Sequence, residues 1–369
     1  MTYLDRVHGE LARISAAEQR RSVRAALPPG TADFSSNDYL GLATDERVVG
    51  ALRAAERAGS GGSRLLGGAY AEHAALERAL AEWTGREAAL LFSSGYLAAL
   101  GAITALASCV DVAYSDALVH ACIIDGLRLT KLERHIVPHA EPPQRGNDAR
   151  AALIVTESAF GMDGSRAPLP ALVDGLRDAD VLLVDEAHAL GVAGHAGAGH
   201  AALRRDPRIV VIGTLSKALG AGGGFAAGPA EVIELLTNRA RTFIFDTALP
   251  PALAAAAQQA LAIVRGAEGE ELRTRVRALA ARIRDDVREL GYDVRGDDGP
   301  IVPIVLGSEG AALALARGLE ERGVHAPAIR PPTVPPGTSR LRISLRANHT
   351  PAEIDRLLGA LRDAALVAR

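Results

Sequence analysis

Residues 181–194 read VLLVDEAHALGVAG, and an unbroken apolar run in this stretch ends abruptly at Asp185, with His188 three residues further on. A continuous apolar run bounded by polar residues is typical of a strand that is buried on both faces of a sheet. Helical patterns separate this run from three others of the same kind, at residues 88–92 (AALLF), 151–157 (AALIVTE) and 209–214 (IVVIGT). We therefore predict an α/β fold with a parallel sheet covered by helices on both faces. Polar residues crowd the carboxyl end of each run, where open α/β sheets bind their ligands.

The chain has 369 residues, enough for one large domain and a smaller one. We expect an N-terminal arm over residues 1–44, whose first thirty or so residues have the pattern of an amphipathic helix. A large domain should follow over residues 45–265, and a smaller α+β domain over residues 266–369.

The C-terminal region carries two local signals. Apolar residues alternate with Arg340 and Arg342, which predicts a strand with both arginines on one face. The sequence Thr350-Pro351-Ala352-Glu353 has the pattern of a capping box with proline at the first helical position, so it predicts the start of a final helix.

Composition excludes several classes of function. The formal net charge of −3 provides no general attraction to nucleic acid or to an anionic membrane. The two cysteines, Cys109 and Cys122, are too few for a disulfide framework, and we expect both to be buried thiols. The charged N-terminus lacks the apolar core of a signal peptide, and the alanine-rich run near residue 255 is too short to span a bilayer. We expect a cytoplasmic protein.

Residues 185–188 spell the DEAH box of an ATP-driven helicase. That motif works beside a phosphate loop ending in Gly-Lys-Ser/Thr, and the chain contains no Gly-Lys dipeptide. No G-x-S-x-G nucleophile elbow surrounds Ser93 or Ser94, and no H-E-x-x-H motif or paired C-x-x-C motif predicts a metal site. Asp185 and His188 therefore need another explanation, in which Glu186 and Ala187 are mostly spacing between strand and loop.

Lys217, in GTLSKALGAGGG, follows another apolar run and is surrounded by small residues. Burial there would lower its pKa and make the amine nucleophilic. Taken singly, Asp185 and Lys217 could be solvated residues and His120 a core histidine. Together they meet the needs of pyridoxal phosphate: a lysine for the Schiff base, an acid for the pyridine nitrogen and a ring to stack on the cofactor. The turn before the helix at Gly95 would hold the phosphate.

These segments occur in order with others over nearly the whole chain: FSSNDYLGL, GSGGSRLLGG, LLFSSGYLAAL, ESAFGMDGSRAPL, LLVDEAHALGVAG, GTLSKALGAGGG, RTFIFDTALPP and IRPPTVPPGTSRLRISL. The set resembles the α-oxoamine synthases, which are fold-type I pyridoxal-phosphate enzymes that condense an amino acid with an acyl thioester and release CO2. The resemblance implies a mostly parallel seven-stranded sheet in the large domain and a homodimer with a shared active site.

The resemblance assigns cofactor roles residue by residue. Lys217 would link to the cofactor and later move a proton at the substrate α-carbon. Asp185 would pair with the pyridine nitrogen, His188 would hydrogen-bond the phenolic oxygen, and His120 would stack on the ring and contact the acyl group. The phosphate would be held by Ser94, Gly95, Tyr96 and Thr214, with Thr247 reaching it from the partner subunit.

Substrate roles follow in the same way. Arg342 should bind the amino-acid carboxylate in a pocket that Asn37 also lines, while Thr333 and Arg20 should contact the acyl substrate. The segments FIFDT and IRPPTVPPGTSRLR favour L-alanine and a pimeloyl thioester, carried by coenzyme A or acyl carrier protein. The family usually has serine where this chain has Gly161, which keeps glycine or serine with another acyl donor open. A homologue without catalytic activity, acting as a binding subunit, is a further alternative.

Overall fold

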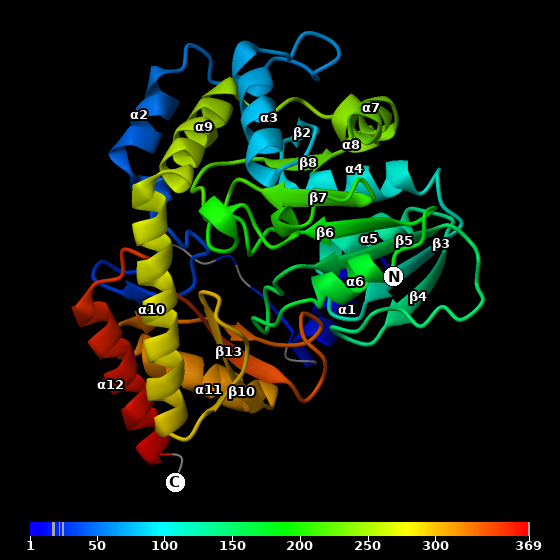
Figure 1. The fold of residues 1–369 in the computed structure, drawn as a ribbon. Helices are drawn as coiled ribbons and strands as arrows, with labels where there is room; N and C mark the ends of the chain where they lie inside the picture. The colour runs from blue at the N-terminus through cyan, green and yellow to red at the C-terminus, as the bar shows by residue number, and fades with distance from the viewer. Residues whose placement is uncertain (17–18, 22, 24–25, 368–369) are drawn as a thin grey trace.

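The structure is a computed structural model of the 369-residue chain, and it describes residues 1–16, 19–21, 23 and 26–367. A seven-stranded sheet forms the centre of the large domain (Figure 1), in the order β2-β8-β7-β6-β5-β3-β4. Only β8 runs antiparallel to its neighbours, so the predicted, mostly parallel sheet is confirmed. The strands are β2 (Ala88–Phe92), β3 (Val112–Asp116), β4 (Glu133–Val137), β5 (Ala152–Glu157), β6 (Val181–Asp185), β7 (Ile209–Thr214) and β8 (Gly224–Gly228).

Helices cover both faces of this sheet, as its apolar strands require. The first face packs against α4 (Gly95–Leu106), α5 (Ala121–Arg128), α7 (Ala230–Arg239) and α8 (Arg241–Ile244). The opposite face packs against α3 (Ala71–Thr84), α6 (Leu169–Asp174) and α9 (Pro251–Arg265). Because the six mutually parallel strands point the same way, the residues after β2, β3, β5, β6 and β7 meet at one edge of the sheet.

The C-terminal part contains a four-stranded antiparallel sheet in the order β12-β13-β10-β9. The 23-residue helix α10 (Ala267–Glu289) runs from the large domain to this sheet (Figure 1). The other elements are β9 (Asp293–Val294), β10 (Ile301–Gly307), α11 (Glu309–Glu320), β11 (Val324–His325), β12 (Ala328–Ile329), β13 (Ser339–Ser344) and α12 (Pro351–Val367). The predicted capping box starts α12, since Thr350 N donates to Glu353 Oε2 at 2.8 Å and Glu353 N donates to Thr350 Oγ1 at 3.3 Å.

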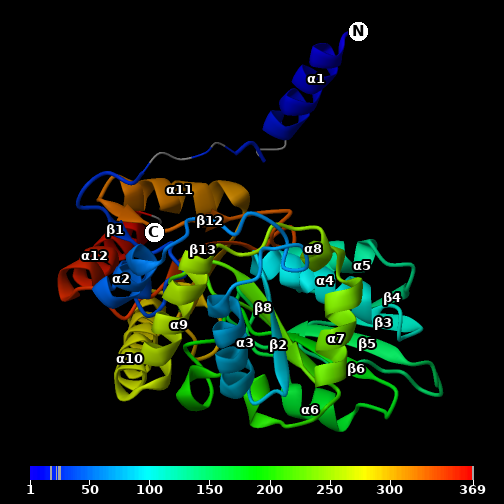
Figure 2. The ribbon, with the colours of Figure 1, turned by 90° about the horizontal axis from the view of Figure 1, so that it is seen from above.

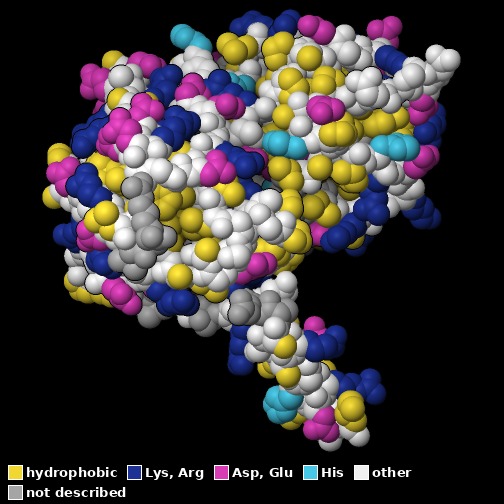
Figure 3. Space-filling model, turned by 90° about the horizontal axis from the view of Figure 1, so that it is seen from below, with side chains coloured by type: hydrophobic (Ala, Val, Ile, Leu, Met, Phe, Trp, Pro, Cys, Tyr) yellow, Lys and Arg dark blue, Asp and Glu magenta, His cyan; other side chains and the backbone are white. Residues whose placement is uncertain are grey.

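The N-terminal segment divides into two parts. The first helix, α1 (Tyr3–Ala16), buries none of its residues and projects away from the body of the molecule (Figures 2 and 3). It is shorter than the expected helix of about thirty residues. Further on, β1 (Ala32–Asp33) pairs with β11, and Phe34, Tyr39 and Leu42 enter the main core before α2 (Glu46–Ala54) begins. This second part ties the chain's beginning to the C-terminal sheet.

Two sequence expectations concern burial. The prediction of two buried cysteines was right for Cys122 and wrong for Cys109, which is exposed. Cys109 lies in the turn after α4. The apolar residues before it belong to the buried helix, and the chain has already left that helix at Cys109. Among the described residues, no helix is long and apolar enough to cross a membrane.

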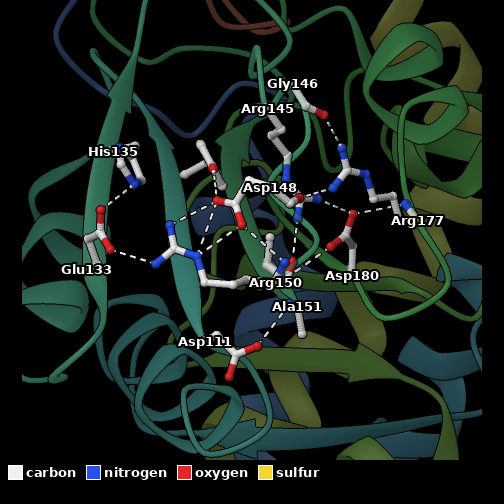
Figure 4. Close-up of polar contacts among 12 residues, drawn as sticks. Asp111, Glu133, His135, Arg145, Gly146, Asp148, Arg150, Ala151, Arg177 and Asp180 are labelled. Carbon is white, nitrogen blue, oxygen red and sulfur yellow. Dashed lines mark hydrogen bonds and ion pairs between the residues drawn. The ribbon is translucent and has the colours of Figure 1, made fainter.

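A polar network secures the loop between β4 and β5 (Figure 4). Its centre is the ion pair between Arg145 and Asp180 at 2.5 Å, whose side chains are only 5% and 1% exposed. Asp180 also accepts hydrogen bonds from the backbone of Arg177 at 2.9 Å and of Ala152 at 3.0 Å. The pair therefore joins the loop to the start of β5.

We expect Asp180→Ala to lower the free energy of unfolding by about 3–5 kcal/mol, because it leaves the Arg145 guanidinium buried without its counter-charge. Urea denaturation measures this change. As the matched control, Asp285→Ala removes an exposed ion pair to Arg288 at 3.3 Å and should cost less than about 1 kcal/mol. Equal losses in the two variants would contradict a buried, structural role for the Arg145 pair.

Candidate active site

A pocket of about 260 Å³ lies at the edge of the sheet where the strand ends meet. Eight of the site residues predicted from the sequence line it. The complete lining is Ser94, Gly95, Tyr96, His120, Cys122, Glu157, Asp185, Ala187, His188, Gly213, Thr214, Ser216 and Lys217. The prediction that the polar strand ends converge is therefore confirmed, while the individual roles stay predictions.

One end of the pocket is the start of α4. Ser94 caps this helix by accepting a hydrogen bond from Leu97 N at 3.2 Å. Among the described residues, the N–H groups of Gly95 and Tyr96 have no hydrogen-bond partner, so they and the helix dipole are available to an anion. Thr214 stands opposite, with its Oγ1 2.8 Å from Ser216 Oγ.

Glycines let the backbone close around this end. A Cβ on Gly95 would lie 3.0 Å from Thr214 Cβ, and a Cβ on Gly224 would lie 2.3 Å from Gly95 N. The second distance is far inside van der Waals contact with backbone, which cannot move as a side chain can. Gly224, on β8, thus determines how closely the sheet approaches the helix start.

Two carboxyl groups lie side by side on the pocket floor. Glu157 and Asp185 end neighbouring parallel strands and are paired in register. Asp185 Oδ1 accepts from Ala187 N at 2.9 Å, while the nearest donor to Oδ2 is the Cys122 thiol, 4.0 Å away. Burial raises the pKa of Asp185, and it raises the pKa of Glu157 to about 8. Oδ2 of Asp185 is a buried acceptor with room for a charged N–H group.

Glu157 was missed in the sequence analysis. The signal was present, because it ends the run AALIVTE as Asp185 ends VLLVD. Its Oε1 accepts the backbone N–H of His120 at 2.6 Å, which anchors the start of α5. The register between β5 and β6, which places the two carboxyl groups together, could not be read from either run alone.

Lys217 lies opposite the carboxyl groups, with Nζ 2.9 Å from His188 Nε2. His188 Nδ1 is in turn 2.6 Å from the hydroxyl of Tyr39, a residue that the sequence analysis also missed. Burial lowers the pKa of the Lys217 amine, as expected, although the nearby Asp185 opposes that shift. Burial likewise holds the pKa of His188 well below its usual value, which favours the neutral ring.

Arg342, on β13, reaches the same region from the C-terminal sheet. Its guanidinium donates to Gly161 O at 2.5 Å, to Ser344 Oγ at 2.7 Å and to Asn37 Oδ1 at 3.0 Å. Arg340 and Arg342 share one strand face as predicted, and both are buried rather than solvated. Arg342 and Asn37 are thus brought together, as their expected role requires.

Gly161 lies against His188. A Cβ at this position would be 2.3 Å from His188 Nε2, so the ring could not keep its position beside any larger residue. His188 can therefore reach Lys217 in this position only because residue 161 has no side chain.

Four of the expected site residues lie outside the pocket centre or turn away from it. Tyr96 lines the pocket, but its exposed hydroxyl donates to Asp125. Thr333 lines a separate groove of about 380 Å³ beside Val119 and Arg340. Thr247 is exposed and does not line this chain's pocket. Arg20 lies on the arm near Ser15, with 3.5 Å between its Nη1 and the serine Oγ.

Glu186 is a correction to the sequence analysis, which treated it as spacing. Its side chain is fully buried beneath the pocket floor, where Oε2 accepts from Ser158 Oγ at 2.6 Å and from His200 N at 3.2 Å. Oε1 accepts from Ala201 N at 2.5 Å. Burial raises the pKa of Glu186 to about 7. Successive side chains point to opposite sides at the end of the strand, so Glu186 points away from the pocket that Asp185 faces. Its hydrogen bonds to His200 and Ala201 hold the following loop in place.

A family model described as aminotransferase class I and II matches residues 30–361. The 8-amino-7-oxononanoate synthase of Anaeromyxobacter dehalogenans strain 2CP-1 is 46% identical over 97% of this chain and 95% of its own length. The chain is an α-oxoamine synthase of the class I and II aminotransferase family. A second relative, the 8-amino-7-oxononanoate synthase 2 of Bacillus subtilis strain 168, is 44% identical over 88% of this chain and 86% of its own length.

Solved structures agree with this membership. The α-oxoamine synthase fold of this chain superposes on the serine palmitoyltransferase of Sphingomonas wittichii with a TM-score of 0.89, at 29% identity over 100% of this chain and 99% of the other. The 8-amino-7-oxononanoate synthase of Francisella tularensis gives a TM-score of 0.77 at 27% identity, over 92% and 98% of the two chains.

The residues present fit pyridoxal phosphate, the cofactor of this family. The unpartnered N–H groups at Gly95 and Tyr96 suit its phosphate, and Asp185 Oδ2 suits its protonated ring nitrogen. Lys217 supplies the amine on the opposite wall. These three features line one pocket.

We expect Gly224→Ala to weaken cofactor binding at least tenfold, because the new methyl group must displace Gly95 and the N–H groups that follow it. Titration of the visible absorbance with pyridoxal phosphate measures the affinity. Gly310→Ala is the matched control, since Gly310 is exposed near the start of α11 and its Cβ would meet nothing within 4 Å. Unchanged affinity in Gly224→Ala would show that the helix start does not bind the phosphate.

Proposed function

We propose that the chain condenses L-alanine with a pimeloyl thioester to give 8-amino-7-oxononanoate, CO2 and the free thiol, a step of biotin synthesis. Two relatives of 46% and 44% identity carry this activity in their names. The single structural observation that supports it is the convergence of Asp185 at the end of β6, Lys217 in the loop after β7 and Arg342 on β13.

The reaction balances without a further reagent. A carbon–carbon bond forms between the alanine α-carbon and the acyl carbonyl carbon, while the carbon–sulfur bond breaks and releases the thiol. The alanine carboxylate leaves as CO2. Bound pyridoxal phosphate supplies an electron sink for the α-carbon through its ring. The chain's residues must therefore hold the reactants, control the protons and exclude water.

Each wall of the pocket supports one of these tasks. The buried Asp185 would keep a proton on the ring nitrogen, since a carboxylate there favours a cation beside Oδ2. Burial lowers the pKa of the Lys217 amine, which favours its role as the base for the α-proton. Arg342 can donate two hydrogen bonds to a carboxylate once the bond from its Nη2 to Asn37 Oδ1 is broken. This would orient the bond to the departing carboxylate.

The groove that Thr333 lines could hold the acyl chain. The groove is lined by Val119, Ile124, Phe160 and a run of prolines, and it lies beside the residue that precedes His120. An apolar groove next to the pocket fits the methylene chain of a pimeloyl group. The carrier, coenzyme A or acyl carrier protein, would bind outside this groove.

A homodimer with shared sites is part of the proposal. Thr247 is exposed near Phe245, which is 69% exposed, and neither contributes to this chain's pocket. Exposed groups at that position are free to complete the pocket of a second copy. Arg20 on the projecting arm would reach the acyl substrate in the same way, and a cytoplasmic location remains a prediction.

A second candidate is the same reaction with serine and another acyl thioester. This chain has Gly161 where the family usually has serine, which removes a hydroxyl group from the site, and the chain superposes on a serine palmitoyltransferase over its whole length. Thiol release measured over alanine, glycine and serine, each with several acyl thioesters, separates the two. A rate with alanine and pimeloyl thioester at least tenfold above the other pairs is the expected outcome. A preference for serine would replace the first proposal with the second.

We expect Lys217→Ala to abolish turnover while the fold is retained. The chain has only two lysines, so exposed Lys131→Ala is the matched control and should keep wild-type activity. Borohydride reduction followed by peptide mass spectrometry should find the cofactor on Lys217 and not on Lys131. A colourless protein that takes up no cofactor would instead support the alternative of a binding subunit without catalytic activity.

A further inference from the structure

A continuous series of hydrogen bonds joins the expected carboxylate site to Lys217. Arg342 Nη2 donates to Asn37 Oδ1 at 3.0 Å, and the Tyr39 hydroxyl lies 3.2 Å from the same oxygen. That hydroxyl is 2.6 Å from His188 Nδ1, and His188 Nε2 is 2.9 Å from Lys217 Nζ. The residues come from four separate segments, and Tyr39 and His188 are buried, so water does not replace these bonds.

The donors and acceptors of this series set its direction. A guanidinium can only donate, so Asn37 must present its oxygen to Arg342. The same oxygen accepts the single proton of the Tyr39 hydroxyl. With its proton on the Asn37 bond, the phenol oxygen accepts from His188, which then carries its proton on Nδ1 and leaves Nε2 as an acceptor toward Lys217; a phenol that donated to Nδ1 instead would place the His188 proton on Nε2. This tautomer is assigned from the hydrogen-bond network.

We propose that Tyr39 is a positioning residue, which holds His188 in the Nδ1–H tautomer and so keeps a hydrogen-bond acceptor against Lys217 Nζ. An acceptor at this position favours a positive charge on the lysine nitrogen, while an N–H donor would oppose it. Because the series begins at Arg342, it also links the residue expected to bind carboxylate with the residue expected to move the proton. The inference goes beyond the proposed function and rests on it only for the role of Lys217.

Other charges surround Lys217 and are left in place by a change at Tyr39. The carboxyl groups of Asp185 and Glu157 favour the protonated amine, and the guanidinium of Arg342 disfavours it. Cys122 and His120 also line the pocket. Because none of these groups is altered in a Tyr39→Phe variant, a shift in the titration of Lys217 reports the hydrogen bond between Lys217 Nζ and His188 Nε2.

The test is the pH dependence of acetic anhydride labelling of Lys217 in the full chain before cofactor is added, with exposed Lys131 as the internal reference. In Tyr39→Phe, Nδ1 loses its acceptor, so the ring should prefer the Nε2–H tautomer and direct a donor at Lys217. We expect the half-labelling pH of Lys217 to fall by about one unit. Tyr114→Phe, which loses a hydroxyl bonded to Asp148 at 3.1 Å outside the pocket, should leave it unchanged.

Asn37→Ala provides a second variant that does not touch His188. It frees the Tyr39 proton to rotate toward Nδ1, which again leaves Nε2 as the donor, so the half-labelling pH should fall in the same direction. With cofactor bound, the pH at which the visible absorbance changes should also fall, because an N–H at Nε2 opposes positive charge on the Lys217 nitrogen.

An unchanged or raised half-labelling pH in folded Tyr39→Phe and Asn37→Ala would overturn the assignment of the tautomer. Circular dichroism confirms that each variant is folded. Labelling needs neither cofactor nor substrate, so this outcome would leave the proposed reaction intact. Conversely, a shift in both variants of a chain that shows no thiol release would support the tautomer and contradict the function.

Discussion

The interaction on which the site depends is the burial of Lys217 opposite two carboxyl groups at one edge of a parallel sheet. The register of β5 and β6 brings Asp185 and Glu157 together, burial raises the pKa of both carboxyl groups, and the charge of Asp185 raises the pKa of Glu157 further. An amine beside them offsets part of that cost. A cofactor with a cationic ring nitrogen and an aldehyde would relieve both sides at once, which is why the arrangement is suited to a ligand.

Close backbone approaches make this arrangement possible. Gly224 allows β8 to meet the start of α4, so that the helix N–H groups face the pocket, and Gly161 allows the ring of His188 to reach Lys217. Neither glycine has a left-handed φ angle. Glycine is required at both positions because a Cβ would collide with neighbouring atoms, and not because of an unusual backbone conformation. Arg342 also packs against residue 161, where its Nε donates to the backbone oxygen of Gly161.

The parts of the site that sequence reasoning predicted are those that follow from position along a strand. Asp185 and Lys217 each follow an apolar run, and parallel strands bring such residues to one edge. Glu186 was misjudged because the direction of a side chain beyond the strand end depends on the loop that packs over it. Cys109 was misjudged for a similar reason, since apolar neighbours in sequence do not establish burial.

The sequence by itself determined the α/β architecture, the helix start at Gly95 and the lysine, because these depend on local periodicity and on chemically distinctive residues. The tertiary structure alone decided the register that pairs Glu157 with Asp185 and the contact of Tyr39 with His188, residues 149 positions apart. Such contacts depend on how whole elements pack, and packing is a property of distant segments together. For that reason the hydrogen-bonded series from Arg342 to Lys217 became visible only once the C-terminal sheet and the N-terminal segment lay beside the strand ends.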